Sequence, residues 1–113
     1  MSTVKGDWHI ALADLAQQDF RNILRWTAEK FGQAQTRDYA LTISTTLQDL
    51  SFGPDMPGVR QRNEIGPGIM TLHVARNRRR GRHFVVFRVS EKEKQRIDVL
   101  RILHEAMDLP AHV

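Results

Sequence analysis

The sequence predicts an α+β protein in which an N-terminal strand and an antiparallel two-helix hairpin precede a mostly antiparallel sheet, in the order β-α-α-β-β-β. Three observations predict this class. Apolar residues recur every three or four positions between residues 14 and 50, extended segments follow Pro57-Gly58, and turns containing glycine or proline punctuate that half of the chain. We expect the hairpin to pack on one face of the sheet, and residues 1–113 to form a single domain.

The first strand is expected in the short apolar stretch Trp8 to Ala13, and the first helix over residues 14–31. Asp14 offers an N-cap, with Gln17 three residues later to complete a capping box. Gly32 stands where a glycine ends a helix. The apolar positions at helical spacing are Phe20, Ile23, Leu24, Thr27 and Phe31.

The second helix follows almost at once and has a narrower apolar stripe. Tyr39 flanks this stripe, and Ser51-Phe52-Gly53-Pro54 ends the helix because proline cannot continue it. The short connection predicts an antiparallel hairpin. The stripe consists of Ala40, Ile43, Leu47 and Leu50.

The second half of the chain reads as strands separated by turns. Phe84 to Phe87 is apolar on both faces, which predicts a central strand covered on each side. His104 to Val113 is expected to be a short tail. The four predicted strands are Val59–Ile65, Ile69–Arg76, Arg82–Val89 and Arg96–Leu103.

Composition excludes several classes of protein. There is no cysteine for a disulfide or a thiolate metal site, and nowhere do about 18 apolar residues follow one another. Residues 1–7 lack the apolar run of a signal peptide, so we expect a cytoplasmic protein without membrane contact. The histidines show no spacing typical of a metal site, and we expect neither metal nor cofactor.

Positive charge comes mainly from arginine. Lys and Arg number 17 against 13 Asp and Glu, a net charge of +4, and only four of the 17 are lysines. Guanidinium groups contact carboxylates and phosphates bidentately, which favours acidic partners. We expect Arg78, Arg79 and Arg80 to be solvated in a turn. For the arginines within strands, a binding role and a merely solubilising one remain equally open.

Three segments resemble the ParE/RelE superfamily of type II toxin–antitoxin toxins, and its ParE-like branch most of all. They are Trp26-Thr27-Ala28-Glu29-Lys30-Phe31-Gly32, Gly58-Val59-Arg60, and the ending from Val99 to Asp108. The resemblance implies a toxin that a co-expressed, ParD-like antitoxin binds and neutralises. ParE-like members are understood to poison DNA gyrase, whereas RelE-like members share the fold and cut messenger RNA on the ribosome.

Two mechanisms therefore compete. As a nuclease, the chain would hold a phosphate with arginines such as Arg60 and Arg82 and use His104 as acid or base. The ribosome-dependent cutters characteristically carry lysines in the middle of the chain, and this sequence has none between Lys30 and Lys92. Arginine is a poor general base. The resemblance thus favours a gyrase-binding toxin that performs no chemistry, with the nuclease as the alternative.

The expected target contacts lie on the sheet and in the tail. They are Arg60, Arg82, Arg101, His104 and Asp108. For His104 we place a structural role, a hydrogen bond to the backbone at the end of a strand, ahead of a chemical one. Asp98, which is polar within an apolar strand, could pair with a neighbouring arginine for structural reasons alone.

The antitoxin is expected to lie across surplus apolar residues of the hairpin, with its acidic, partly disordered tail folding against the arginines in a toxin–antitoxin complex. Trp26, Leu50 and Phe52 are the candidates, although Trp26 and Phe52 could instead complete the core, and for Phe52 we expect that role. A third hypothesis is a nucleic-acid-binding module that inserts Arg78 to Arg80 at phosphates, and we rank it last.

Overall fold

The computed structural model describes residues 6–113. Residues 1–5 lie outside the described residues, and so does most of the segment 1–7 in which no signal-peptide run was found. In residues 6–113 no helix has both the length and the apolarity to span a bilayer. The elements are β1 (His9–Leu12), α1 (Asp14–Phe31), α2 (Gln33–Asp49), a 3-10 turn η1 (Leu50–Phe52), β2 (Arg60–Gln61), β3 (Met70–His73), β4 (His83–Val89), β5 (Arg96–His104) and α3 (Leu109–His112).

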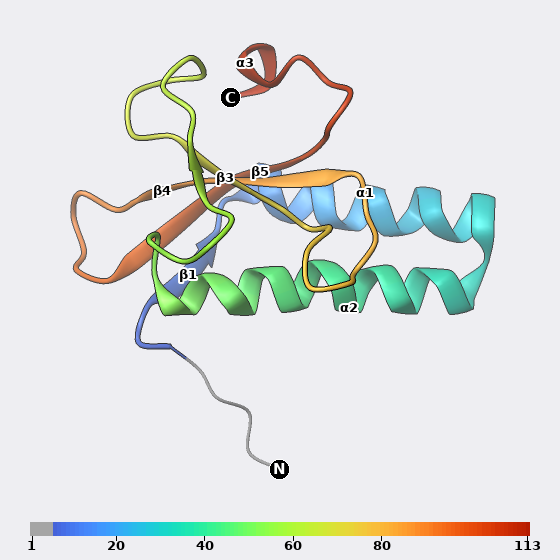
Figure 1. Cartoon of the computed structure of the whole chain (residues 1–113). Coiled ribbons are helices and arrows are strands. Elements are labelled where there is room, and N and C mark those ends of the chain that lie inside the picture. Colours follow the sequence, from blue (N-terminus) through green and yellow to red (C-terminus); the bar gives the residue numbers. More distant parts are fainter. Residues whose placement is uncertain (1–5) are drawn as a thin grey trace.

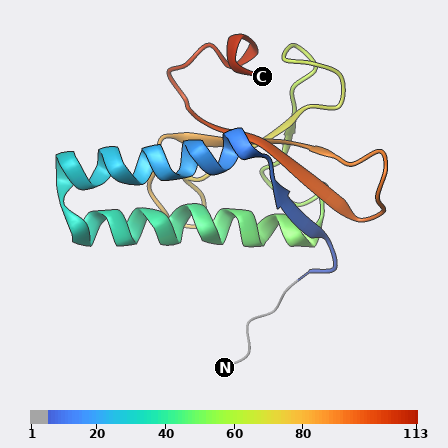
Figure 2. The same ribbon diagram turned by 180° about the vertical axis from the view of Figure 1, so that it is seen from behind.

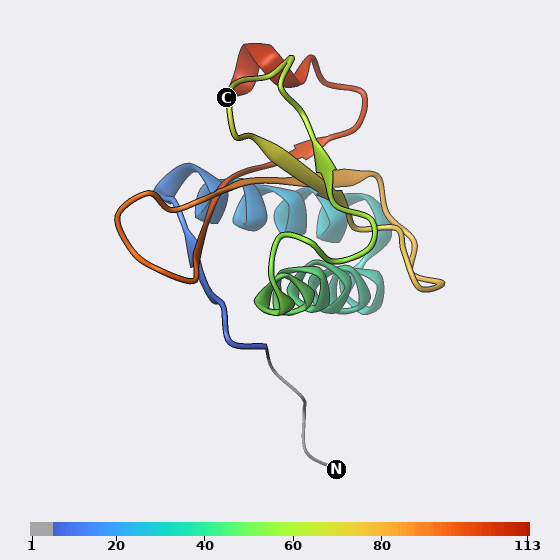
Figure 3. The same ribbon diagram turned by 60° about the vertical axis from the view of Figure 1, so that its left-hand side comes forward.

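The five strands form one sheet in the order β1-β5-β4-β3-β2. Every neighbouring pair is antiparallel except β1 and β5, which run parallel. Helices α1 and α2 lie side by side on one face of the sheet (Figures 1 and 2). The chain end with α3 lies on the opposite side (Figure 3). The α+β fold predicted from the sequence is therefore confirmed, with a mostly antiparallel sheet.

The main core lies between the hairpin and the sheet. Ile43 and Leu50 from the helical side and Phe87, Ile97 and Val99 from the sheet are fully buried there. Burial of each such side chain stabilises the fold by about 1.5–3 kcal/mol. This core fixes α1 and α2 relative to β4 and β5.

A smaller apolar cluster covers the other face of the sheet. Val86 of β4 and Leu103 of β5 pack there with Ile69 and Leu109. The predicted central strand is thus covered on both faces, as its apolar pattern indicated. The C-terminal tail contributes to this cluster, because Leu109 at the start of α3 is buried against the sheet.

The start of α1 differs from the expected capping box. Asp14 is already helical, Ala13 occupies the N-cap position, and no side chain caps the helix. The amide of Gln17 donates instead to the Leu12 carbonyl at 3.1 Å. The prediction of Asp14 as N-cap was wrong by one residue, because β1 continues directly into the helix.

The strands next to loops are shorter than predicted. Strand β2 keeps only two residues of the expected Val59–Ile65, because the chain turns at Arg62, whose carbonyl accepts the Ile65 N–H at 2.9 Å. Strand β3 ends at His73 rather than at Arg76. The guanidinium of Arg76 is drawn away to Asp49 at the end of α2, at 2.8 Å.

The loop after β3 is anchored rather than solvated throughout. Arg79 also reaches Asp49, at 2.9 Å, and only 20% of its side chain is exposed. The expectation that Arg79 is solvated was therefore wrong, while Arg78 and Arg80 are exposed as predicted. One carboxylate thus holds two arginines and ties the loop to α2, which fixes the residues that follow it.

Candidate functional site

A cleft with a volume of about 530 Å³ lies between the hairpin and one end of the sheet. The C-terminal half of α1 and the N-terminal half of α2 form one wall. The first residue of β4, the last residue of β5 and the loop before β4 form the other. The side chains that matter below are Trp26, Phe31, Tyr39, Arg82, His83 and His104.

Tyr39 joins the two walls. Its hydroxyl accepts the Arg82 backbone N–H at 3.2 Å and lies 2.6 Å from Nδ1 of His83. Burial raises the pKa of this phenol, so the hydroxyl keeps its proton for His83. The chain can pass this close because residue 81 is glycine: a Cβ there would lie 2.4 Å from Val74 Cγ2 and 2.8 Å from the Tyr39 ring.

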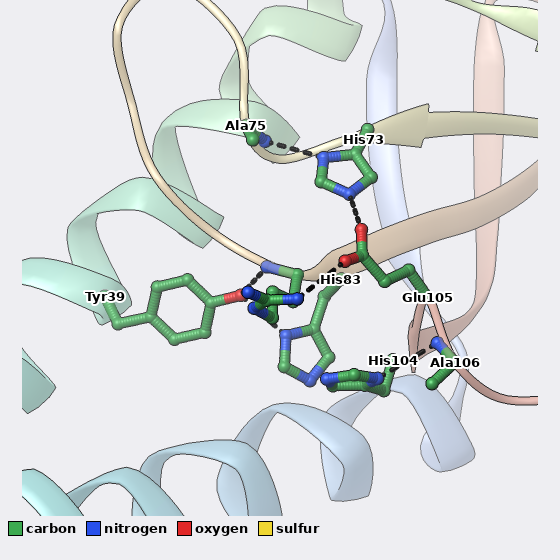
Figure 4. Close-up of polar contacts among 8 residues, drawn as sticks. Tyr39, His73, Ala75, His83, His104, Glu105 and Ala106 are labelled. Atoms are coloured by element: carbon green, nitrogen blue, oxygen red, sulfur yellow. Dashed lines mark hydrogen bonds and ion pairs between the residues drawn. The ribbon is translucent and has the colours of Figure 1, made fainter.

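His83 is held in its neutral form. Burial, followed by the nearby His104 and His73, lowers the pKa of His83 to about 4. Its Nδ1 accepts the Tyr39 hydroxyl, so the ring proton resides on Nε2. Its ring meets the His104 ring edge-on, with centroids 5.3 Å apart (Figure 4).

The neighbouring histidines are arranged in the same tautomer. Nδ1 of His104 accepts the Ala106 backbone N–H at 3.0 Å, and Nδ1 of His73 accepts that of Ala75 at 3.0 Å (Figure 4). The expected backbone hydrogen bond of His104 is therefore confirmed. The Nε2–H of His73 donates to Glu105 at 2.7 Å, and this bond is the main cause of the lowered pKa of Glu105.

The histidine wall of the cleft offers hydrogen-bond donors. The Nε2–H groups of His83 and His104 make no hydrogen bond to another part of residues 6–113, and Arg82 adds a guanidinium with 76% of its side chain exposed. No group of three histidine, aspartate or glutamate side chains within residues 6–113 is arranged to hold a metal ion. Oxygen acceptors such as carboxylates suit this set of groups.

Comparison with known proteins assigns the chain to a protein family. The sequence profile described as "ParE toxin of type II toxin-antitoxin system, parDE" matches residues 10–109. The chain belongs to the ParE toxin family. Toxin ParE1 of Caulobacter vibrioides is 27% identical over 103 residues, which cover 90% of this chain and 94% of that protein. The ParE-family resemblance found in the sequence is therefore confirmed, and the chain is a type II toxin by family.

Two solved structures share the fold of this ParE-family chain. The chromosomal ParDE toxin–antitoxin system of P. aeruginosa matches with a TM-score of 0.67 at 19% identity, covering 87% of this chain and 96% of that one. The RelBE2 toxin–antitoxin complex of Mycobacterium tuberculosis matches with a TM-score of 0.56 at 17% identity, covering 87% and 98%. At 19% and 17% sequence identity, these two matches show that the fold is shared.

The residues expected to contact a target fall into two groups. Arg60, Arg82 and Asp108 are exposed, and His104 is half-buried at the cleft. Arg101 is instead engaged within the fold of this ParE-family chain. Its guanidinium binds Asp19 of α1 through two bonds of 2.8 and 2.9 Å, and only 20% of its side chain is exposed.

The residues expected to bind an antitoxin do not form one surface. Trp26 is 53% exposed at the cleft, whereas Leu50 is fully buried in the core, so its predicted exposure was wrong. Phe52 is 54% exposed, which overturns its expected core role. Phe52 lies just after the C-terminal end of α2, whereas Trp26 faces residues near the N-terminal end of α2. The two positions are separated by roughly 20 Å along the helix. Leu50 is buried because the apolar stripe of α2 extends into η1, so that its side chain packs in the core between the hairpin and the sheet.

Sequence reasoning missed the residues that build the cleft. In the sequence, Tyr39 only flanks the apolar stripe, and His83, like the other histidines, shows no spacing typical of a metal site. Their contact joins positions 44 residues apart, so no local pattern shows it. The available signal was the sequence Gly81-Arg82-His83, a glycine after an arginine-rich turn that lets the backbone approach another element. The predicted pairing of Asp98 with an arginine is confirmed, with Arg96 Nε at 2.8 Å.

Proposed function

We propose that this toxin inhibits DNA gyrase by occupying one of its surfaces, and that a cognate, ParD-like antitoxin neutralises it in the cytoplasm. Family membership and the similarity to Toxin ParE1 support the toxin role. The P. aeruginosa neighbour belongs to a ParDE toxin–antitoxin system, which supports an antitoxin partner for this chain.

The observation that carries the binding mechanism is the state of the histidines. A general base near pH 7 needs a pKa close to neutrality. His83 has a pKa of about 4, and the Nδ1 atoms of all three clustered histidines are occupied by hydrogen bonds. These side chains hold the sheet end in place, and His83 and His104 present Nε2–H donors. They support recognition of a target surface rather than proton transfer.

The proposed target contacts are Arg60, Arg82, His104 and Asp108. Arg60 of β2 and Arg82 of the loop before β4 are both exposed, and arginines are frequent anchors of protein interfaces. Alanine at Arg60 or Arg82 should relieve growth arrest, with a loss of gyrase affinity of about 2–4 kcal/mol for a contact buried in the complex. Arg101 supports this surface indirectly through Asp19.

One experiment tests the mechanism. Purified toxin is added in parallel to a gyrase supercoiling assay and to a translating ribosome extract in which a messenger RNA is followed by primer extension. We expect supercoiling to stop at stoichiometric toxin and the transcript to stay intact. An unaffected gyrase beside a cleaved transcript would exclude gyrase as the target.

The ribosome-dependent nuclease stands as a second candidate because Arg82, His83 and His104 line the same cleft. A phosphate held by the guanidinium would lie near two imidazoles there. The His104→Gln variant distinguishes the candidates, because glutamine keeps a donor but cannot exchange a proton near neutral pH. A nuclease would lose transcript cleavage with this change, whereas a gyrase-binding toxin should keep most of its inhibition.

A further inference from the structure

The outer face of α2 carries no charge along most of the helix. Charged residues make up 27% of the chain, yet none lies between Tyr39 and Gln48. The outer face of the neighbouring helix α1 carries Arg21, Arg25 and Glu29, which are exposed as expected for a face in water. Charged residues are depleted where two proteins pack together. The composition of α2 therefore indicates a face that another molecule covers.

Two large apolar side chains lie on this face. Leu41 is 67% exposed, more than any other large apolar side chain in residues 6–113, and Phe52 is 54% exposed. Their separation in the sequence is close to three helical turns, so they share one side of α2 and its extension η1, roughly 16 Å apart. Ile43 and Leu50 are fully buried on the opposite side. A helix lying alongside α2 would contact both exposed side chains.

The face is complementary to a second copy of itself. When two identical helices pack antiparallel about a two-fold axis, the same patch of each copy forms the contact. With the axis midway between Leu41 and Phe52, Leu41 of one copy lies against Phe52 of the other, and this contact occurs twice. Ser44 and Gln48 lie between the two contacts and are exposed and uncharged. The two helices can therefore approach without burying a charge.

The charges at the two ends of the face are also complementary. Arg37 lies one turn before Leu41, and Asp55 lies three residues after Phe52. Both charged side chains are exposed, and neither forms an ion pair within residues 6–113. In the two-fold arrangement Arg37 of each copy approaches Asp55 of the other. An acidic partner would gain nothing from the uncharged middle of the face, so the observations favour a second copy.

We propose that the chain forms a weak, two-fold symmetric dimer through the outer faces of α2, with Leu41 packed on Phe52 of the second copy and Arg37 beside Asp55 of the second copy. A single helix from each copy makes a contact at the lower end of the size range of specific interfaces. The net charge of +4 on each chain opposes association in general. The dimer therefore forms only at high protein concentration.

The dimer leaves the cleft uncovered. The cleft is lined by Asp38, Tyr39 and Thr42, which lie on a different side of α2 from Leu41. Arg82 and His104, which we propose as target contacts, lie on its opposite wall. Self-association thus goes beyond target binding and neutralisation, and it can be present or absent independently of both.

Sedimentation equilibrium of the purified toxin tests the dimer, at concentrations from about 10 μM to about 1 mM. We expect the weight-average mass to rise from that of one chain toward that of two. Leu41→Glu places a charge in each half of the contact and should weaken association at least tenfold. Gln18→Glu is the matched control, because Gln18 is exposed on the outer face of α1. It should leave association within twofold, and circular dichroism checks the fold of both variants. A toxin that stays monomeric throughout, or a dimer that Leu41→Glu leaves unchanged, would overturn the proposal.

Reversal of the terminal charges tests the arrangement of the two copies. Arg37→Asp and Asp55→Arg should each weaken the dimer at least threefold. The double variant should restore it to within twofold, because both ion pairs form again with opposite sign. A change in overall repulsion cannot produce this pattern, since Arg37→Asp lowers the net positive charge and Asp55→Arg raises it. Absence of recovery in the double variant would overturn the antiparallel arrangement.

Cross-linking locates the two-fold axis. The chain has no cysteine, so a single introduced thiol can pair only with its counterpart in the second copy. Gln48 lies close to the axis, whereas Ala34 is also exposed on α2 but lies far from it. Gln48→Cys should form a disulfide-linked dimer on oxidation and Ala34→Cys should not, because the two Cα atoms must lie within about 7 Å. Equal cross-linking of the two variants would overturn the proposed axis.

These outcomes are separate from those of the supercoiling assay. A monomeric toxin that still stops gyrase removes the dimer and leaves the proposed function standing. A dimer formed by a toxin that does not affect gyrase removes the proposed function and leaves the dimer. Loss of association on Trp26→Ala rather than on Leu41→Glu would place the contact at the cleft and overturn the proposal.

Discussion

The two ends of the helical hairpin have the same kind of amphipathic sequence but different surroundings. At the sheet-covered end, Ala16 of α1 and Ile43 of α2 are fully buried. At the overhanging end, Trp26 and Phe31 are more than half exposed. The strands run at an angle to the helices, so the sheet leaves the hairpin tip uncovered (Figures 1 and 2). An apolar stripe therefore encodes a buried face only where another layer meets it.

This difference assigns stability to one end and recognition to the other. Removing side chains at the covered end should lower the free energy of unfolding, because each removal leaves a cavity in a packed interior. Removing them at the overhanging end should change binding while the fold persists. The following predictions test that division.

The largest effect is expected for Leu50→Ala. Leu50 is fully buried where α2 passes into η1, and its truncation should lower the free energy of unfolding by about 2–5 kcal/mol. Urea denaturation followed by circular dichroism measures this loss. Leu41→Ala on the exposed side of α2 is the control and should stay within about 0.5 kcal/mol. A loss below about 1 kcal/mol for Leu50→Ala would contradict its place in the core.

Asp19→Ala should come next. Asp19 accepts two bonds from the Arg101 guanidinium and one from the Ile102 N–H at 3.0 Å, and its side chain is only 14% exposed. Its removal leaves a partly buried charge and a backbone donor unpaired, which we expect to cost about 2 kcal/mol. The reciprocal Arg101→Ala and the double variant complete a double-mutant cycle. Additive losses across that cycle would show that the pair does not couple α1 to β5.

A pH-dependent effect of similar or smaller size is expected at His83, where the covered and overhanging ends meet. Its pKa is about 4 in the fold against 6.5 for the free side chain, so the unfolded chain binds more protons between these values. Stability from the neutral ring is complete above pH 6.5 and is lost as the pH falls toward 4. Full enclosure would give about 3 kcal/mol, which solvent screening reduces to about 1–2 kcal/mol.

The measurement compares denaturation of the parent and of His83→Gln from pH 4 to pH 8. Glutamine does not titrate, so the curve of the variant should be flatter in this range. Glu105, whose pKa is lowered, also loses stabilising contacts as pH falls, but it does so in both proteins. Parallel curves for the two proteins would mean that His83 does not titrate as its burial requires.

The smallest effect is expected for Phe31→Ala. Phe31 ends α1 and contacts Trp26 edge-on while 57% of it faces solvent. Its truncation should change the free energy of unfolding by at most about 1 kcal/mol, from the lost aromatic contact. A loss as large as that of Leu50→Ala would mean that the overhanging end is part of the core, and the functional division of the hairpin would fail.

The sequence predicted the regular elements well and their ends less well. Helix α1 spans the predicted residues 14–31, because its periodicity and Gly32 are local signals. Strand β2 was predicted as Val59–Ile65 and contains only Arg60–Gln61, because the turn at Arg62 forms by hydrogen bonds that leave no periodic pattern. Strand β5 is one residue longer than predicted because His104 pairs with His83.

The candidate site was predicted only in part. Trp26, Arg82 and His104 were selected from the sequence and lie together at the cleft. Leu50 and Phe52 exchanged their expected environments, since both lie within one short turn and its direction depends on how η1 meets the sheet. Arg101 was selected for its charge, and its partner Asp19 is 82 residues away in the sequence.

The amino-acid sequence by itself determined the α+β class, the order of elements and the resemblance to the ParE family, because periodicity, turn residues and motif order are local properties of the chain. Tertiary structure alone decided which arginines are free, which apolar residues remain uncovered, and that Tyr39 meets His83. Those properties depend on contacts between distant segments, whose geometry is set by the packing of the hairpin across the sheet.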